Sequence, residues 1–154
     1  EKNPFGRRHI MSLYQETDLN ETEGLYPCAF ETIWSVRKVN DDYVLDMTLI
    51  QRSNDYIMAG YINKIQYVAL QMMVACHLGY ELGTFSHFTQ NLHIYDRHLD
   101  AAIEILEREP LEFQPTIELK CDNFTNFYEI KLSDFVINTS KDIKKIESKL
   151  EIAI

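Results

Sequence analysis

Cys28 is the residue of this 154-residue chain best suited to nucleophilic chemistry, because it follows Pro27 in a turn just before an apolar, strand-like run. A thiol attacks carbon as its thiolate, and neighbouring guanidinium groups favour that form. Arg52 closes the second of two β-rich runs that a short polar turn joins into a predicted hairpin. An antiparallel hairpin brings residues far from its tip back together, so we expect Arg52 to approach Cys28.

The basic residues have the chemistry needed to hold a phosphate. Arginine guanidinium groups bind phosphate oxygens in pairs, which suits Arg52 and the adjacent Arg7 and Arg8. Ser53 adds a hydroxyl donor next to Arg52. These four residues predict a phosphate-binding cluster.

Three further polar residues suit a base and a sugar. Asn63 opens a predicted helix and offers both a donor and an acceptor to an amide-like edge. His93 and Tyr95 alternate along a predicted strand, so both side chains point to one face, where they suit two hydroxyl contacts. A phosphate, a hydrogen-bonding base and a sugar together indicate a nucleotide.

Each residue also has a structural explanation when it is taken alone. A lone cysteine such as Cys28 is more often a core residue than a nucleophile, and an arginine pair is usually a solvated charge pair. Asn63 could cap its helix, and His93 and Tyr95 could pack on a strand surface. These alternatives stay open on residue type alone.

The pattern of elements predicts a single α+β domain over residues 1–154, with a mixed or antiparallel twisted sheet and a buried central helix. The helix at 65–76 carries apolar groups on both faces and should end near Gly79. We expect the charged tail at 139–150 to be exposed. Strands are predicted over 7–15, 29–39, 43–53, 84–95, 116–120 and 126–138, and a second helix over 96–109.

Composition narrows the classes of partner. The net charge of -9 disfavours a nucleic-acid scaffold but allows a small phosphorylated ligand, and no apolar run is long enough to cross a membrane. Three cysteines without metal-like spacing fit a reducing cytoplasm, and we expect no metal site. Cys76 falls on the apolar helical stripe and is assigned to the core, whereas Cys121 receives no role.

The order and spacing of these residues resemble the thymidylate synthase family over nearly the whole chain. Members show an arginine pair opening a strand, then Pro-Cys, then Gln-Arg-Ser-x-Asp, an Asn eight residues after that Asp, and finally His-x-Tyr. The matching residues here are Arg7-Arg8, Pro27-Cys28, Gln51-Arg52-Ser53-Asn54-Asp55, Asn63 and His93-Ile94-Tyr95. Several spaced motifs in the right order make the match specific.

The resemblance implies that Cys28 adds to C6 of the uracil ring of dUMP. The C5 carbon would then attack the methylene of 5,10-methylenetetrahydrofolate, which also supplies a hydride, so that the products are dTMP and dihydrofolate. Arg52 and Ser53 would hold the phosphate. Arg7 and Arg8 would reach the same phosphate from the other subunit, because the family forms obligate homodimers whose sheets pack back to back.

The remaining nucleotide contacts also follow from the resemblance. Asn63 would read the uracil edge and favour it over cytosine. His93 and Tyr95 would hold the deoxyribose hydroxyl, and Gln51 belongs to the same dUMP-binding set.

On the folate side, Asp55 would contact the pterin, and the hydrophobic end at Ala153 and Ile154 would close over the bound folate. The chain departs from the family at Ala59 and Tyr61, which replace the Gly and Pro of a Gly-x-Pro-x-Asn loop. The family also carries a substantial segment before the arginine pair, whereas this sequence begins at Glu1. We therefore expect a C-terminal part of a thymidylate synthase that is inactive on its own.

Two other functions fit parts of the same pattern. A pyrimidine 5-hydroxymethylase would use the same thiol and folate, but the asparagine at position 63 favours uracil over the cytosine that such enzymes often read. A non-catalytic module for nucleotide binding or dimerisation would fit a chain that lacks the family's first segment.

Overall fold

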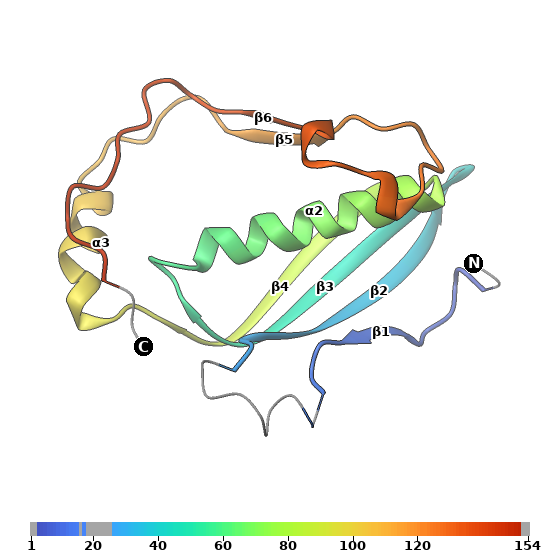
Figure 1. The fold of residues 1–154 in the computed structure, drawn as a ribbon, viewed down its shortest axis with the longest axis horizontal. Helices are drawn as coiled ribbons and strands as arrows, with labels where there is room; N and C mark the ends of the chain where they lie inside the picture. The colour runs from blue at the N-terminus through green and yellow to red at the C-terminus, as the bar shows by residue number, and fades with distance from the viewer. Residues whose placement is uncertain (1–2, 16, 18–25, 152–154) are drawn as a thin grey trace.

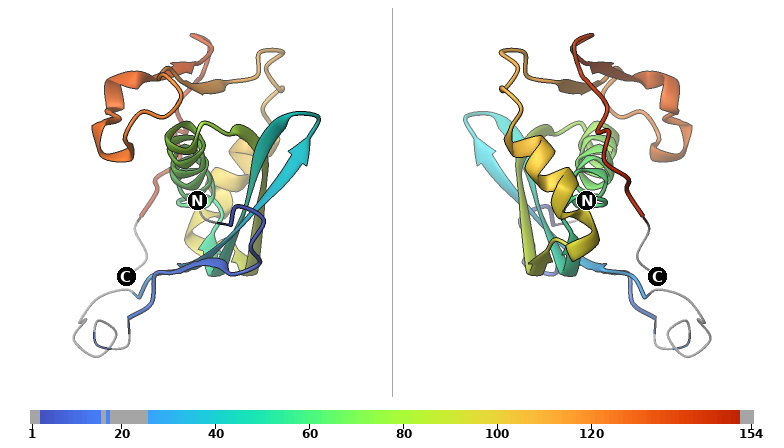
Figure 2. Two further views of the ribbon diagram at one scale, coloured as in Figure 1. Left: turned by 90° about the vertical axis from the view of Figure 1, so that its right-hand side faces the viewer. Right: turned by 90° about the vertical axis from the view of Figure 1, so that its left-hand side faces the viewer.

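The protein folds as a four-stranded sheet covered on one face by a long helix. The structure is a computed structural model, and it describes residues 3–15, 17 and 26–151. The helix, α2 (Gly60–Leu78), lies between the sheet and a small two-stranded ribbon (Figure 1). Figure 2 shows the same layering from the side, with α2 on one side of the sheet only. The other elements are β1 (His9–Ser12), β2 (Ala29–Val39), β3 (Asp42–Asp55), β4 (Glu81–His93), η1 (Asp96–His98), α3 (Leu99–Leu106), β5 (Thr116–Leu119), η2 (Phe127–Glu129), η3 (Leu132–Asp134) and β6 (Phe135–Asn138).

The sheet is mixed, which is one of the two forms that the sequence predicts. Its order is β1-β2-β3-β4, with antiparallel pairs between β1 and β2 and between β2 and β3. Asn40 takes a φ of 55° in the two-residue turn between β2 and β3, a conformation that asparagine tolerates well. β4 then pairs parallel to β3, and α2 provides the crossover between them. The predicted hairpin and the predicted α+β class are therefore confirmed.

β3 forms the centre of the core. Leu45, Met47 and Leu49 alternate along the strand and are at most 3% exposed, because they point under α2. The helix is less buried than the sequence predicts, since the side chains of Ile62 and Ile65 are each more than half exposed. Its apolar groups are thus only partly covered by the described residues.

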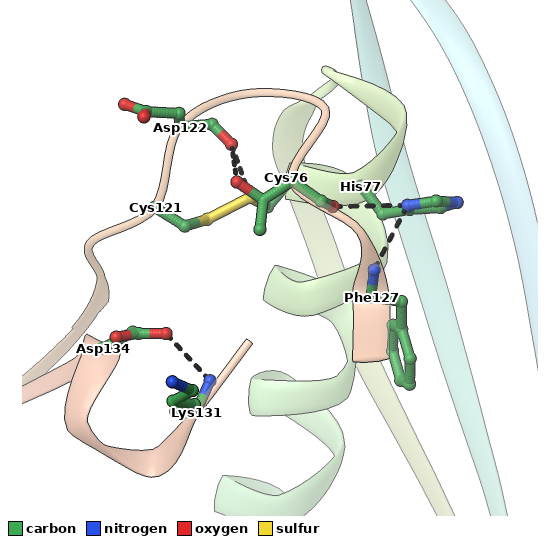
Figure 3. The surroundings of a disulfide bond; sticks show 8 residues. Cys76, His77, Cys121, Asp122, Phe127, Lys131 and Asp134 are labelled. Atoms are coloured by element: carbon green, nitrogen blue, oxygen red, sulfur yellow. Dashed lines mark hydrogen bonds between the residues drawn. A yellow bond between two sulfur atoms is a disulfide. The ribbon is translucent and has the colours of Figure 1, made fainter. Parts of the chain in front are cut away.

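The end of α2 is tied to the segment that follows β5. Gly79 ends the helix in the left-handed conformation, as predicted, and an added Cβ there would lie 2.3 Å from the ring of Phe124. Cys76 is buried, as expected, but it forms a disulfide with Cys121, for which the sequence predicted no role (Figure 3). The ring of His77 accepts a hydrogen bond from the backbone N–H of Phe127 at 3.3 Å.

Several element boundaries differ from the sequence prediction. The strand predicted over 126–138 is strand only at β6, because two 3₁₀ turns precede it, and the Asn126 side chain caps the first by accepting from Tyr128 N. The helix predicted over 96–109 begins with the 3₁₀ turn η1 and ends at Leu106. The first strand is confined to β1, within the predicted 7–15.

The charged C-terminal tail is exposed, as predicted, but its main chain is held by α3. The carboxylate of Glu104 accepts from the backbone N–H groups of Glu147 and Ser148 at 3.0 Å and from the Ser148 hydroxyl at 2.8 Å. Arg108 pairs with Glu104 and donates to the backbone carbonyls of residues 144–145. These contacts fix the path of the tail across α3.

Glu104→Gln should destabilise the chain in a pH-dependent way. The backbone N–H groups of Ser148 and Glu147 lower the pKa of Glu104 to about 2, from 4.5. A depressed folded-state pKa stabilises the fold above pH 4.5, and this contribution disappears as the pH falls towards 2. The gap in thermal unfolding midpoint between the original chain and Glu104→Gln should therefore be largest near neutral pH and shrink across this window.

Glu107→Gln, at the end of the same helix, is the control and should show no such dependence. A midpoint gap for Glu104→Gln that stayed constant from neutral pH to pH 2 would contradict the anchoring role.

Candidate active site

A pocket lies where β3 and β4 end and α2 begins. Because the two strands are parallel, both carboxyl ends meet at one edge of the sheet, which is the usual place for a ligand beside parallel strands. The pocket has a volume of about 550 Å³. It is lined by Pro27, Cys28, Ala29, Gln51, Arg52, Ser53, Asn54, Asp55, Met58, Ala59, Asn63, Gln66, Tyr67, His93 and Tyr95.

Arg52 clamps the turn that carries Cys28. Its backbone N–H donates to the carbonyl of Cys28 at 2.9 Å, so the predicted approach of the two residues is confirmed. Its guanidinium donates to the carbonyls of Tyr26 at 2.9 Å and Pro27 at 3.2 Å. Tyr14 completes the clamp, because its hydroxyl donates to Pro27 O at 2.8 Å and accepts from Arg52 at 3.2 Å. A charged donor thus fixes the position of a free cysteine at the pocket wall.

The clamp leaves part of the guanidinium for a ligand. Its donors to the carbonyls are Nε and Nη2, so among the described residues Nη1 has no partner. Ser53 lines the pocket beside Arg52, as the phosphate prediction requires. Arg7 and Arg8 are exposed and do not line the pocket of this chain.

His93 and Tyr95 meet at the end of β4. Their rings contact edge to face, with centroids 4.8 Å apart, and both line the pocket. His93 is the last residue of the strand and Tyr95 immediately precedes η1, so the predicted shared face holds although Tyr95 lies outside the strand. Asp55 pairs with His93 in the sheet. Its side chain accepts from the backbone N–H groups of Ile57 and Met58, which shapes the turn into α2.

Asn63 lies in the first turn of α2 rather than at its cap. The N-cap position is Ala59, so the alternative explanation of Asn63 as a helix cap is wrong. Gln51 is only 1% exposed, and its side-chain amide donates to Asn63 Oδ1 at 3.1 Å. Gln51 therefore supports Asn63 from beneath, and it also lines the pocket.

Two residues of this region were missed by the sequence prediction. His87 Nε2 lies 2.8 Å from Gln51 Oε1, and Asn54 donates to both Gln51 and Asn63. His87 could have been found from the alternation of β4, which places it on the face covered by α2. Burial and the nearby Lys64 ammonium lower the pKa of His87, so its ring is neutral near pH 7.

Some expectations concern residues or ligands beyond this geometry. Ala153 and Ile154, predicted to close over folate, lie outside the described residues. Within the described part of the chain, no group of three or more potential metal ligands comes together. Among those same residues, no helix has the length and apolar character needed to cross a bilayer.

Comparison with known proteins decides the family. The family model described as thymidylate synthase matches residues 1–152. The chain belongs to the thymidylate synthase family. It is 49% identical to the thymidylate synthase of Streptococcus gordonii over 152 residues, covering 99% of this chain and 54% of that protein. It is 47% identical to the thymidylate synthase of Streptococcus thermophilus over 154 residues, covering 100% of this chain and 54% of that protein.

A solved structure shows the same fold. The thermostable thymidylate synthase A from Bacillus subtilis superposes with a TM-score of 0.84 at 33% identity, covering 99% of this chain and 51% of that one. This confirms the predicted thymidylate-synthase-like α+β architecture. The chain spans about half the length of the curated relatives it matches.

Arg52→Lys should loosen the turn that carries Cys28. A single ammonium cannot reproduce the fork that binds the carbonyls of Tyr26 and Pro27, so we expect the free energy of unfolding to fall by about 1 kcal/mol. Urea titration measures this loss. Arg8→Lys, on the exposed N-terminal segment, is the control, and an equal effect of both substitutions would argue against the clamp.

Proposed function

We propose that this chain supplies the nucleophile and most of the nucleotide contacts of a thymidylate synthase, which converts dUMP to dTMP with 5,10-methylenetetrahydrofolate. The observation that carries the proposal is the meeting of Cys28, Arg52, Asn63 and His93 around one pocket, from segments far apart in the sequence. The family assignment supports the same activity. Without the geometry, each residue would keep its structural explanation.

In this mechanism Cys28 is the nucleophile and adds as thiolate to C6 of the uracil ring. Covalent addition makes C5 electron-rich, which divides one difficult carbon–carbon bond formation into easier steps. The folate supplies the one-carbon unit and the hydride when it is bound. The clamp from Arg52 to the Cys28 turn would hold the sulfur in place through these steps.

The phosphate would bind to Arg52 and Ser53. Arg52 and Ser53 both line the pocket, and Nη1 of Arg52 has no partner within the described residues. His93 and Tyr95 would hold the sugar hydroxyl from the end of the neighbouring strand, β4. Asn63 would read the base, and its preference for a uracil edge separates this function from that of a cytosine-directed 5-hydroxymethylase.

The pocket also contains a carboxylate that fits a folate. Asp55 is the single acidic residue among the described residues of the lining, and its side chain remains 15% exposed. A carboxylate accepts paired N–H donors, which the edge of a pterin provides. No step of the mechanism requires a metal ion. By the family resemblance, Ala153 and Ile154 would close over the folate.

A second copy of the chain is the proposed partner. The sheet face opposite α2 carries Ile33, Ile50 and Phe88 on neighbouring strands, and Phe88 is 55% exposed. Such an apolar face is suited to a homodimer interface. Arg7 and Arg8, which lie outside the pocket of their own chain, are then free to reach the phosphate of the partner's site. We also propose that the activity takes place in the cytoplasm.

Cys28→Ser should abolish turnover in the complete enzyme that contains this chain. A serine hydroxyl is a far weaker nucleophile, so we expect dihydrofolate formation to fall by about 10³-fold or more, while dUMP affinity changes little because phosphate and base contacts remain. Dihydrofolate absorbance measures the rate, and calorimetry measures dUMP binding. Cys121→Ser is the matched control and should stay active. Undiminished turnover in Cys28→Ser would exclude the thiol mechanism.

The 154-residue chain alone should form little or no dTMP. It spans about half of its relatives, so groups that the other half provides are missing from the reaction. The measurement is dTMP formation from radiolabelled dUMP by the purified chain, with the complete enzyme as positive control. Turnover by the chain at a rate near that of the complete enzyme would refute this expectation.

A further inference from the structure

A chain of hydrogen bonds runs beneath the pocket from β4 to α2. His87 Nε2 lies 2.8 Å from Gln51 Oε1, and Gln51 Nε2 donates to Asn63 Oδ1 at 3.1 Å. Asn54 donates to Gln51 Oε1 at 3.2 Å and to Asn63 Oδ1 at 3.3 Å. Gln51 and Asn54 are only 1% and 2% exposed, so water does not substitute for these partners.

Which group donates and which accepts in each of these hydrogen bonds depends on the neighbouring bonds. An amide offers an oxygen that accepts and a nitrogen that donates, so fixing one end of Gln51 fixes the other. When Gln51 Oε1 accepts from His87, its nitrogen must face Asn63, which then presents its oxygen inward. The Asn63 nitrogen consequently points the other way, where it donates to Gln66 at 3.4 Å in the pocket wall.

The position of the single proton on the neutral His87 ring decides this direction. Burial, with the nearby Lys64 ammonium, lowers the pKa of His87, so only one ring nitrogen carries a proton. A proton on Nε2 makes His87 the donor to Gln51, and the Thr89 hydroxyl at 3.2 Å can accept from the same group. A proton on Nδ1 instead would make Nε2 an acceptor and would turn both amides around.

We propose that His87 is a positioning residue that, through Gln51, keeps the Asn63 NH₂ group directed at the pocket and thereby sets which pyrimidine edge the site accepts. This rests on the proposed function, since it assumes that a pyrimidine nucleotide occupies the pocket. An outward NH₂ group pairs with a ring carbonyl oxygen, as in uracil. The exocyclic amino group of cytosine would instead face the Asn63 NH₂ group, so that two donors meet and neither has an acceptor.

Asn54 alone does not fix the orientation of the Gln51 and Asn63 amides. Its buried Oδ1 has no partner within the described residues, while its NH₂ group serves two acceptors. If Gln51 and Asn63 turned around, Asn54 would turn as well and leave its nitrogen unpaired instead. Asn54 therefore makes the same number of hydrogen bonds in either orientation of the amides. The position of the proton on His87 decides between the two orientations.

The proton position can be measured on the chain itself. Long-range ¹H–¹⁵N correlation spectra distinguish a ring nitrogen that carries a proton from one that does not, and His87→Gln assigns the signals by their disappearance. We expect the proton on Nε2 of His87. A proton on Nδ1, with Nε2 bare, would overturn the proposal whether or not the chain binds a nucleotide.

The consequence for specificity is tested with three variants. We expect His87→Phe, which removes the donor to Gln51, to lower the ratio of the dCMP to the dUMP dissociation constant by about tenfold. His87→Gln restores a side-chain donor and should keep the ratio within about threefold of the original. His77→Phe, at the far end of α2, is the matched control and should leave the ratio unchanged.

Each result decides between the role of His87 and the function of the pocket. An unchanged ratio in His87→Phe would overturn the positioning role, and so would an equal loss in His87→Phe and His87→Gln. If His87→Phe fails to fold, His87→Gln and the proton position still test the proposal. An original chain that binds neither nucleotide would count against the proposed function, and the proton position would then decide the hydrogen-bond direction alone.

Discussion

The parallel pairing of β3 with β4 is the constraint on which the site depends. It brings the carboxyl ends of both strands to one edge, with Gln51 opposite Thr89 and Asp55 opposite His93. A parallel pair requires a crossover, and α2 provides it. The start of that helix returns to the same edge and delivers Asn63 beside the strand ends. An antiparallel partner for β3 would have placed His93 at the far end of the sheet.

Buried amides hold this pairing in place at the start and in the middle of α2. Gln71, on the middle of the helix, donates to the carbonyls of Leu45 and Thr84, where the register between the strands shifts. Gln51 and Asn54 form the corresponding contacts at the pocket. Each group would cost free energy if it were left unpaired in the interior, so the amides favour one placement of the helix over its alternatives. The same residues that fix α2 therefore also prepare the floor of the pocket.

Sequence reasoning succeeded where the signal is local or ordered along the chain. The polar turn at Asn40 and the cap at Gly79 are set by neighbours in sequence, so the hairpin and the end of the central helix were predictable. The grouping of the candidate residues at one pocket was predictable because the spaced motifs follow a family order. The pairing of Cys76 with Cys121 was missed, because a separation of 45 residues leaves no local pattern. His87 was missed because its partners come from other elements.

The alternation of apolar residues was also misleading where short polar contacts compete with strand formation. In the segment 126–138, the side chain of Asn126 accepts from Tyr128 N and that of Asp134 accepts from Lys131 N, so each closes a tight turn. In the site, by contrast, the polar side chains bond to distant elements. These hydrogen bonds cannot form before the elements have packed together. Gln51 acquires its partners only when β4 and α2 are both packed on β3. The pocket is therefore a product of the long-range pairing, and a folded sheet is required before Cys28, Asn63 and His93 can meet around it.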